Sequence, residues 1–289
     1  MPVGGILFDR LERTVMRNDP GYPATFAGSL GRDTADEGLR EAIARIGERR
    51  SYAAPYESLT FTVLTRARRE LVVTLAAQPV FDLVRSTPVA RRIRRRVRHR
   101  GGESALIGLG RRTLEPADLI RIDTQTLENG LDLLRLGAND SGVLPAFWRT
   151  VASSGGRFDL LCAEMQHESA PGTLLVEVMG GLEQAPPDAI QEAIQHFETG
   201  SLGMILHIAP DPGAALRLAQ VRAHCLAIDF AGVEHENARD WQAAAQLIAA
   251  ARRACPQLLL LNLRPDRGLA AQAAGATHAV FAGMEAVVV

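Results

Sequence analysis

Residues 225–263 read CLAIDFAGVEHENARDWQAAAQLIAAARRACPQLLLLNL, and this stretch decides the fold class. It begins with the short apolar run Cys225–Asp229 and continues with an amphipathic pattern over Ala238–Ala254. A second apolar run, Leu258–Leu263, ends it. Continuous apolar runs are typical of strands that are buried on both faces, and the segment between them is long enough for a helix. The stretch therefore predicts a strand–helix–strand unit of a parallel sheet.

The same alternation extends over the last third of the chain. Further apolar runs lie at 173–179, 204–208 and 278–281, and further helical patterns lie between the runs, at 187–198, 212–223 and 267–274. Pro187 and Pro212 stand where proline suits the start of a helix. At this chain length the alternatives are a closed (β/α)₈ barrel and a doubly wound sheet. No GxGxxG motif follows a predicted strand, which weakens the dinucleotide-binding version of the second.

The sequence before this region predicts further strands and a helix of the barrel domain, preceded by an N-terminal extension. Alternating residues over 60–65 and 71–75 flank a polar turn and predict a hairpin, which continues into a buried strand at 78–83. Residues 124–136 predict a helix, with Leu residues along one face. Residues 1–56 are predicted to form an N-terminal extension, helical or partly disordered, and residues 57–289 the α/β barrel domain.

Composition excludes several function classes. The chain has 289 residues, 47% of them apolar, and its net charge of -1 provides no global field that would recruit nucleic acid or a membrane. All 32 basic residues are Arg, so Schiff-base chemistry, a P-loop lysine and a lysine base are excluded. The three cysteines are widely spaced and predict reduced thiols in a cytoplasmic protein. Neither a signal peptide nor an apolar run of membrane-spanning length is found.

Arginine dominates residues 91–100, which read RRIRRRVRHR. This run predicts a site for an anionic partner, such as an acidic protein surface, an anionic lipid or nucleic acid. If the run is helical, Ile93 and Val97 form a thin apolar seam beside the charges. The plainer interpretation is a solvated loop. No aromatic residue is interleaved, which argues against a surface that stacks single-stranded bases. The candidate binding residues are Arg91, Arg92, Arg94, Arg95, Arg96 and Arg98.

Residues 78–80, 174–178, 227–229 and 274–278 are four short segments that resemble the EAL family, the cyclic di-GMP phosphodiesterases. Gln78-Pro79-Val80 is similar to the Gln-Pro-(Ile/Val) of its first barrel strand, and Leu174–Val178 is similar to its fourth strand, which ends in Glu. Ala227-Ile228-Asp229 resembles its Lys-Ile-Asp, with Ala in place of Lys, and residues 274–278 resemble its Leu-Gly-Cys-Asp stretch. The resemblance covers roughly residues 71–283 and implies a (β/α)₈ barrel of the TIM type.

The departures from the family's pattern concern its chemistry. The resemblance implies two divalent metals held by acids and an Asn at the C-terminal ends of several strands. Residues 206–209 read LHIA where the family has Asp-Asp-Phe-Gly, and residues 261–264 read LNLR near its Glu-Gly-Val-Glu. Glu103–Leu106 stands for Glu-Ala-Leu with an extra residue, and no Asn lies in 143–151. Of the expected ligands only Glu177 and Asp229 remain.

These departures lead to three hypotheses. The first is a catalytically inactive EAL-like domain without cofactor or metal, which serves bacterial signalling or scaffolding by binding a protein partner; a homodimer is a further expectation of the resemblance. The alternative is a cyclic di-GMP receptor that binds without cutting, with Gln78, Glu177, Asp229 and Arg264 as candidate ligand-binding residues. The third is an unrelated TIM-barrel enzyme, and nucleic-acid binding by the arginine run ranks behind all three.

Each surviving polar residue also has a plainer interpretation. Glu177 and Asp229 could serve only to hydrogen-bond neighbouring loops at the barrel mouth. His207 on an apolar strand is more often a core histidine with satisfied hydrogen bonds than a metal ligand.

Overall fold

In the computed structural model, residues 58–102, 114–134, 141–166, 173–199, 203–233 and 238–283 are described. Eight of its strands close into a barrel, in the order β2 to β9, because β2 also pairs with β9. From β3 to β9 each strand is parallel to the next, and β2 is antiparallel to both β3 and β9. Their bounds are β2 Glu70–Asp82, β3 Thr87–His99, β4 Ser141–Phe147, β5 Thr173–Met179, β6 Gly203–Ile208, β7 Cys225–Asp229, β8 Leu258–Leu263 and β9 His278–Phe281.

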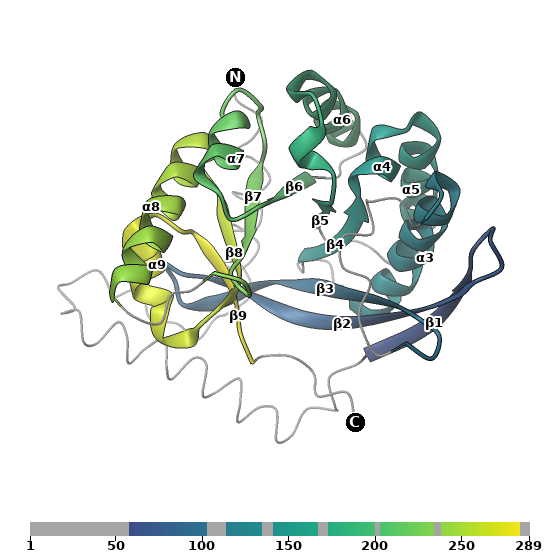
Figure 1. Cartoon of the computed structure of the whole chain (residues 1–289), viewed down its shortest axis with the longest axis horizontal. Helices are drawn as coiled ribbons and strands as arrows, with labels where there is room; N and C mark the ends of the chain where they lie inside the picture. Colours follow the sequence, from purple (N-terminus) through teal and green to yellow (C-terminus); the bar gives the residue numbers. More distant parts are fainter. Residues whose placement is uncertain are drawn as a thin grey trace, which may run out of the picture.

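Helices connect the parallel strands and lie outside the barrel (Figure 1). Each crossover from β3 onward contains at least one helix, as parallel neighbours require. The helices are α3 Pro116–Leu134, α4 Trp148–Ala152, α5 Ser154–Gln166, α6 Pro187–Thr199, α7 Pro212–Arg217, α8 Ala238–Ala254 and α9 Gly268–Ala274, with short 3₁₀ turns η1 Leu182–Gln184 and η2 Pro265–Arg267. No helix in the described part of the chain is long and apolar enough to cross a membrane.

Side-chain alternation divides the core into two parts. On β5, Leu174, Val176 and Val178 belong to the large cluster between the strands and the helices. Leu175 belongs to a separate cluster that fills the barrel interior. The interior cluster is Val80, Val143, Leu175, Ile205, Cys225, Ala227, Leu259, Leu261 and Val280. The lower part of the barrel is therefore a packed apolar core and not a channel.

The first three strands extend beyond the barrel as an antiparallel ribbon (Figure 1). Strand β1, Ser58–Leu64, pairs only with the first half of β2, and the second half of β3 pairs with the same part of β2. Strand β3 pairs with β4 only at Arg91 and Arg92 and then diverges from it. Because β3 is parallel to β4, the ribbon projects on the side where the parallel strands have their C-terminal ends.

The barrel that the EAL resemblance implied, and that was one of the two alternatives left by the strand–helix alternation, is confirmed. The five C-terminal strands lie where the apolar runs indicated, within one residue. The predicted hairpin is also present, although 70–82 is one continuous strand. The helical and loop interpretations of the arginine run are both wrong, because Thr87–His99 is a strand that pairs along its length with β2. The predicted extension 1–56 lies outside the described residues, so the domain boundary stays a prediction.

Candidate functional site at the barrel mouth

A buried ion pair between β3 and β5 occupies the barrel interior above the apolar layer. Glu177 follows Leu175 at the inward-facing positions of β5, and its side chain has no exposed surface. Arg92 on β3 faces it. Arg92 Nε donates to Glu177 Oε2 at 2.5 Å, and Arg92 Nη2 donates to Glu177 Oε1 at 2.9 Å. This two-pronged geometry is the strongest form of a guanidinium–carboxylate contact.

Two more side chains complete this network. Arg92 Nη1 donates to Gln78 Oε1 at 2.9 Å, from the neighbouring strand β2. His207 on β6 places Nδ1 2.9 Å from Glu177 Oε1. An ionised carboxylate can only accept, so His207 Nδ1 carries the donated proton. We call Gln78, Arg92, Glu177 and His207 the mouth network, and it joins four strands across the barrel.

The charges in the mouth network stabilise each other. Burial alone would raise the pKa of Glu177, but Arg92 and His207 outweigh burial and lower it far below its ordinary value. Burial alone would lower the pKa of Arg92, but Glu177 outweighs it and raises that pKa. Glu177 is therefore ionised at neutral pH and has an internal counter-ion.

A second buried ion pair fills the gap where β3 diverges from β4. Arg95 Nη1 lies 2.5 Å from Asp123 Oδ1 of α3, and the Arg95 guanidinium lies over the ring of Phe147, 4.0 Å from its centre. Asp123 Oδ2 also accepts from the backbone N–H of Phe147 at 2.9 Å, beyond the part of β4 that pairs with β3. Burial raises the pKa of Asp123, although Arg95 opposes the rise. Arg95 thus serves the core and not the surface.

Asp229 and Arg264 form hydrogen bonds with residues at or near the ends of β7 and β8. Asp229 Oδ1 accepts from Asn262 Nδ2 at 2.6 Å and from the N–H of Ala231 at 2.8 Å. Arg264 is exposed and donates through Nε to Asp266 Oδ1 at 3.0 Å. Asp229 ties the ends of β7 and β8 together, which agrees with the plainer interpretation of this residue.

The structure brings some predicted residues together and separates others. Gln78 and Glu177 share the mouth network, whereas Arg264 lies in the loop after β8. Of the arginine run, Arg92 and Arg95 are held inside by carboxylates, and Arg91 donates to the carbonyl of Leu134. Sequence reasoning did not foresee the ion pairs Arg92–Glu177 and Arg95–Asp123. Strand alternation alone could not identify them, since Arg92 and Arg95 lie on opposite faces of β3.

A divalent metal does not fit the mouth network. Hard cations need several converging oxygen ligands, but both Glu177 oxygens are held by a guanidinium and an imidazole. Among the residues that the structure describes, no group of three or more His, Cys, Asp or Glu side chains could hold a metal ion. The predicted counterpart of Glu-Ala-Leu, residues 103–106, lies outside the described ranges.

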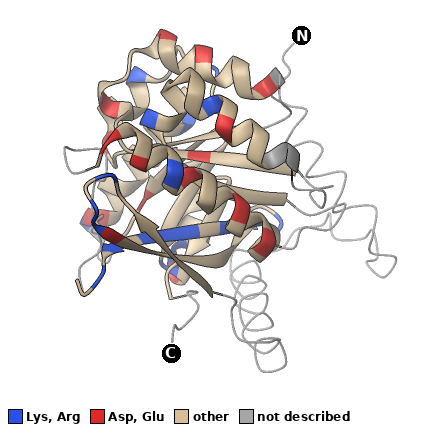
Figure 2. Cartoon of the chain, turned by 90° about the vertical axis from the view of Figure 1, so that its right-hand side faces the viewer, with Lys and Arg blue, Asp and Glu red and all other residues tan. Residues whose placement is uncertain are grey.

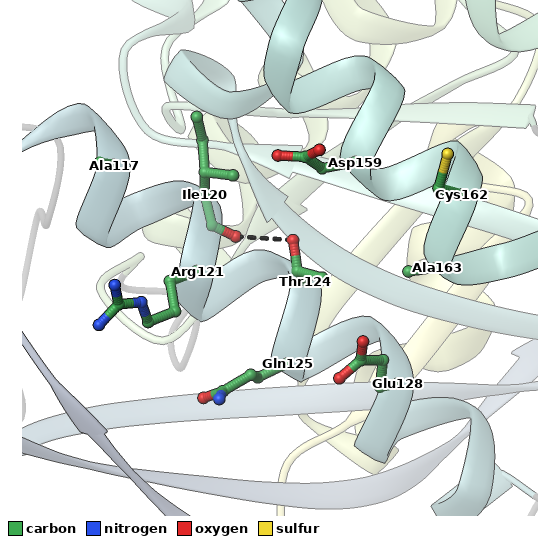
Figure 3. A pocket seen from close by; sticks show the side chains of 9 residues that line it. All are labelled: Ala117, Ile120, Arg121, Thr124, Gln125, Glu128, Asp159, Cys162 and Ala163. Carbon is green, nitrogen blue, oxygen red and sulfur yellow. Dashed lines mark hydrogen bonds between the residues drawn. The ribbon is translucent and has the colours of Figure 1, made fainter. Parts of the chain in front are cut away.

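A cavity of about 630 Å³ opens on the outside of the barrel, between α3 and α5 (Figure 3). Its lining includes Arg121, Thr124 and Glu128 from α3, and Asp159 and Cys162 from α5. Since both helices lie outside the strands, this groove is separate from the mouth network. The barrel mouth remains the candidate site, because it brings hydrogen-bonded polar side chains from four of the described strands together.

Thiol reactivity should distinguish Cys162 from the other two cysteines. Cys225 and Cys255 are buried, and burial raises the pKa of both thiols, whereas Cys162 lines the groove between α3 and α5. Because the thiolate is the reactive form, one thiol should react rapidly with a disulfide reagent and two only after unfolding. The measurement is labelling of the folded protein followed by denaturation. Rapid labelling that persists in Cys162→Ser would contradict this assignment.

The fold was compared with known proteins. No protein-family model and no curated protein sequence matches the chain. Solved EAL-domain structures do match, at low sequence identity. An EAL domain protein from Listeria monocytogenes has a TM-score of 0.51 at 11% identity, over 88% of this chain and 92% of that one.

Two other matches have bound nucleotide. The FimX EAL domain from Pseudomonas aeruginosa, bound to c-di-GMP, has a TM-score of 0.53 at 14% identity, over 84% of this chain and 93% of that one. The Bacillus subtilis YkuI protein, in complex with its substrate c-di-GMP and calcium, has a TM-score of 0.56 at 12% identity, over 71% of this chain and 53% of that one. The chain is thus EAL-like: its barrel has the fold of EAL domains.

Proposed function

We propose that this chain is a catalytically inactive EAL-like domain that works in bacterial signalling or scaffolding, in the cytoplasm, by binding a protein partner. The observation that carries the proposal is the ion pair of Arg92 with Glu177. A metal-dependent phosphodiesterase needs free carboxylates that converge on its metals. Here an internal cation neutralises the buried carboxylate of β5, so the residue is committed to holding the barrel together.

The loops at the mouth support the same proposal. Asp229 is bonded to Asn262 and Ala231, which fixes it to neighbouring backbone and side chain. No lysine exists in the chain to replace the missing one of the EAL pattern. Hydrolysis of a phosphodiester would thus lack both the metals and the lysine of the EAL pattern. Fold alone does not decide function, so the proposal rests on these contacts and not on the likeness.

A cyclic di-GMP receptor that does not cut its ligand is the second candidate. Two of the EAL structures that share this fold were solved with c-di-GMP. On the described part of the mouth, Arg94 is half-buried, and it lies near enough to Asp229 and Arg92 for their charges to affect its pKa. Burial and Arg92 lower that pKa, and Asp229 opposes them. Arg94 would have to exchange these internal neighbours for the phosphates of the ligand.

Calorimetric titration of the full chain with cyclic di-GMP separates the two candidates. The titration is done in the absence of metal, with Mg²⁺ and with Ca²⁺. We expect no heat of binding in any of the three conditions. Saturable heat of binding without turnover would favour the receptor over the protein-interaction module. In that case Arg94→Gln should abolish the binding. Binding that requires a metal, accompanied by cleavage, would overturn both.

A further inference from the structure

A line of arginines lies on one face of the β1–β3 ribbon. Side chains of a strand alternate between its two faces, so Arg94, Arg96 and Arg98 share one face, and Ile93 and Val97 are buried on the other. Arg96 and Arg98 are exposed and Arg94 is half-buried. Figure 2 shows basic residues, in blue, along the strands of the ribbon. Consecutive members are two residues apart, which sets their spacing at about 6.6–6.8 Å along the strand.

Hydroxyl groups lie beside this line on the neighbouring strands. The strand register places Thr74 of β2 opposite Arg96 and Thr60 of β1 opposite Thr74. Thr60 Oγ1 and Thr74 Oγ1 are 3.3 Å apart and hydrogen-bonded. The next row contains Arg98, Val72 and Thr62. We call the arginine line together with these threonines the arginine face.

The charge on the arginine face is almost entirely positive. Glu70 is the acidic residue that β1, β2 and β3 place on this face, and it is paired with Arg100. Arg96 and Arg98 have no carboxylate partner among the described residues. Arg68 and Arg69, in the turn between β1 and β2, are exposed at the same end of the ribbon. The local field is therefore strong although the net charge of the chain is only -1.

We propose that the arginine face binds the phosphodiester backbone of duplex nucleic acid without reading its sequence. A backbone of evenly spaced monoanions is complementary to a straight, evenly spaced line of guanidinium groups, which are well suited to phosphate oxygens. Threonine hydroxyls are common phosphate donors beside arginine. Arg92 of the mouth network lies on the same face of β3, and Arg96 and Arg98 continue that face beyond the part of β3 that pairs with β4. Neither Arg96 nor Arg98 belongs to the mouth network, so the inference does not depend on the proposed function.

The composition of the face favours a duplex over other polyanions. No aromatic residue lies on this face of the three strands, so unpaired bases find no stacking surface. A membrane-docking surface uses several large apolar side chains to enter the lipid, but Leu64 is the exposed large apolar residue on this face. Duplex nucleic acid needs only the regular charges and hydroxyls that are present.

The test uses the full chain and a fluorescently labelled DNA duplex of arbitrary sequence. Binding is followed by anisotropy at several salt concentrations. Contacts from the two exposed arginines, Arg96 and Arg98, predict a slope of log K against log salt of roughly −2, at about −0.9 per phosphate. Arg96→Gln combined with Arg98→Gln should weaken binding about tenfold or more and reduce the steepness of the slope by about 2.

The matched control removes two exposed arginines elsewhere, by Arg222→Gln combined with Arg253→Gln. This control should bind the duplex as the unaltered chain does, and circular dichroism should find both variants folded. The proposal is overturned if the duplex does not bind, or if control and arginine-face variants lose affinity equally. It is also overturned if unlabelled cyclic di-GMP displaces the duplex, or if only anionic vesicles or an acidic peptide bind.

Discussion

Replacement of Arg92 by Met is expected to lower the free energy of unfolding by about 3–5 kcal/mol, because it leaves the Glu177 carboxylate buried without a counter-ion. Glu177 has no exposed surface, so water cannot replace the lost donors without opening the barrel mouth. Gln78 loses a hydrogen-bond partner at the same time. The measurement is equilibrium unfolding in urea, in which the midpoint should fall while the slope is retained.

A double variant separates the charge from the packing. Arg92→Met combined with Glu177→Leu removes both charges and should recover most of the loss, because well-packed apolar pairs are often as stable as buried ion pairs. Arg96→Met on the exposed face of the same strand is the matched control and should change stability by about 0.5 kcal/mol or less. A double variant as unstable as Arg92→Met alone would show that the two residues do not act as a pair.

The ion pair between Arg92 and Glu177 also predicts how the stability of the protein depends on pH. The pKa of Glu177 is lower in the folded protein than its ordinary value of 4.5, so the unfolded chain takes up this proton first as the pH falls. The contribution is complete above about pH 4.5 and is lost as the pH falls through the folded pKa. As the pH falls, the stability of the unaltered chain should therefore decrease relative to that of the double variant, which lacks this carboxyl group.

Replacement of Asp123 by Asn should destabilise the protein by about 3 kcal/mol, near the lower end of the range for breaking a buried pair. The substitution leaves the Arg95 guanidinium buried against Phe147 without a counter-charge. The lower value is expected because burial raises the pKa of Asp123, so its charge already carries a desolvation cost. Urea unfolding measures the loss.

Glu128→Gln, an equivalent change at an exposed position of the same helix, is the control and should be close to neutral. Local effects should appear in hydrogen exchange. Asp123→Leu should speed exchange of the Phe147 amide, because this variant also loses the oxygen that accepts its N–H. Unchanged exchange at Phe147 would show that this hydrogen bond does not protect the end of β4.

The last five strands were predictable because each is a continuous apolar run between amphipathic helices. Both faces of such a strand are buried, so the pattern is unambiguous in sequence. The arginine run was not predictable in the same way. Val97 and Ile93 are its only apolar members, and they do not show which arginines are buried. Ion pairs with Glu177 and Asp123, 85 and 28 residues away, determine that, and they exist only in the folded barrel.

The candidate site was likewise predictable only in part. Gln78 and Glu177 could be singled out from short motifs, because each lies on a strand whose pattern is clear. Their engagement by Arg92 could not be, since it depends on three strands that meet across the barrel interior. Asp229 is different, because its role follows from its position at a strand end. Its carboxylate accepts hydrogen bonds from the adjacent loop and from the end of β8.

The most direct test of an inactive barrel is incubation of the full chain with cyclic di-GMP and Mg²⁺ or Mn²⁺, followed by chromatography of the nucleotide. The account predicts that the cyclic dinucleotide remains intact, because the Glu177 carboxylate is committed to Arg92 and His207. Formation of the linear dinucleotide in proportion to protein concentration, and its loss in Glu177→Gln, would contradict the account.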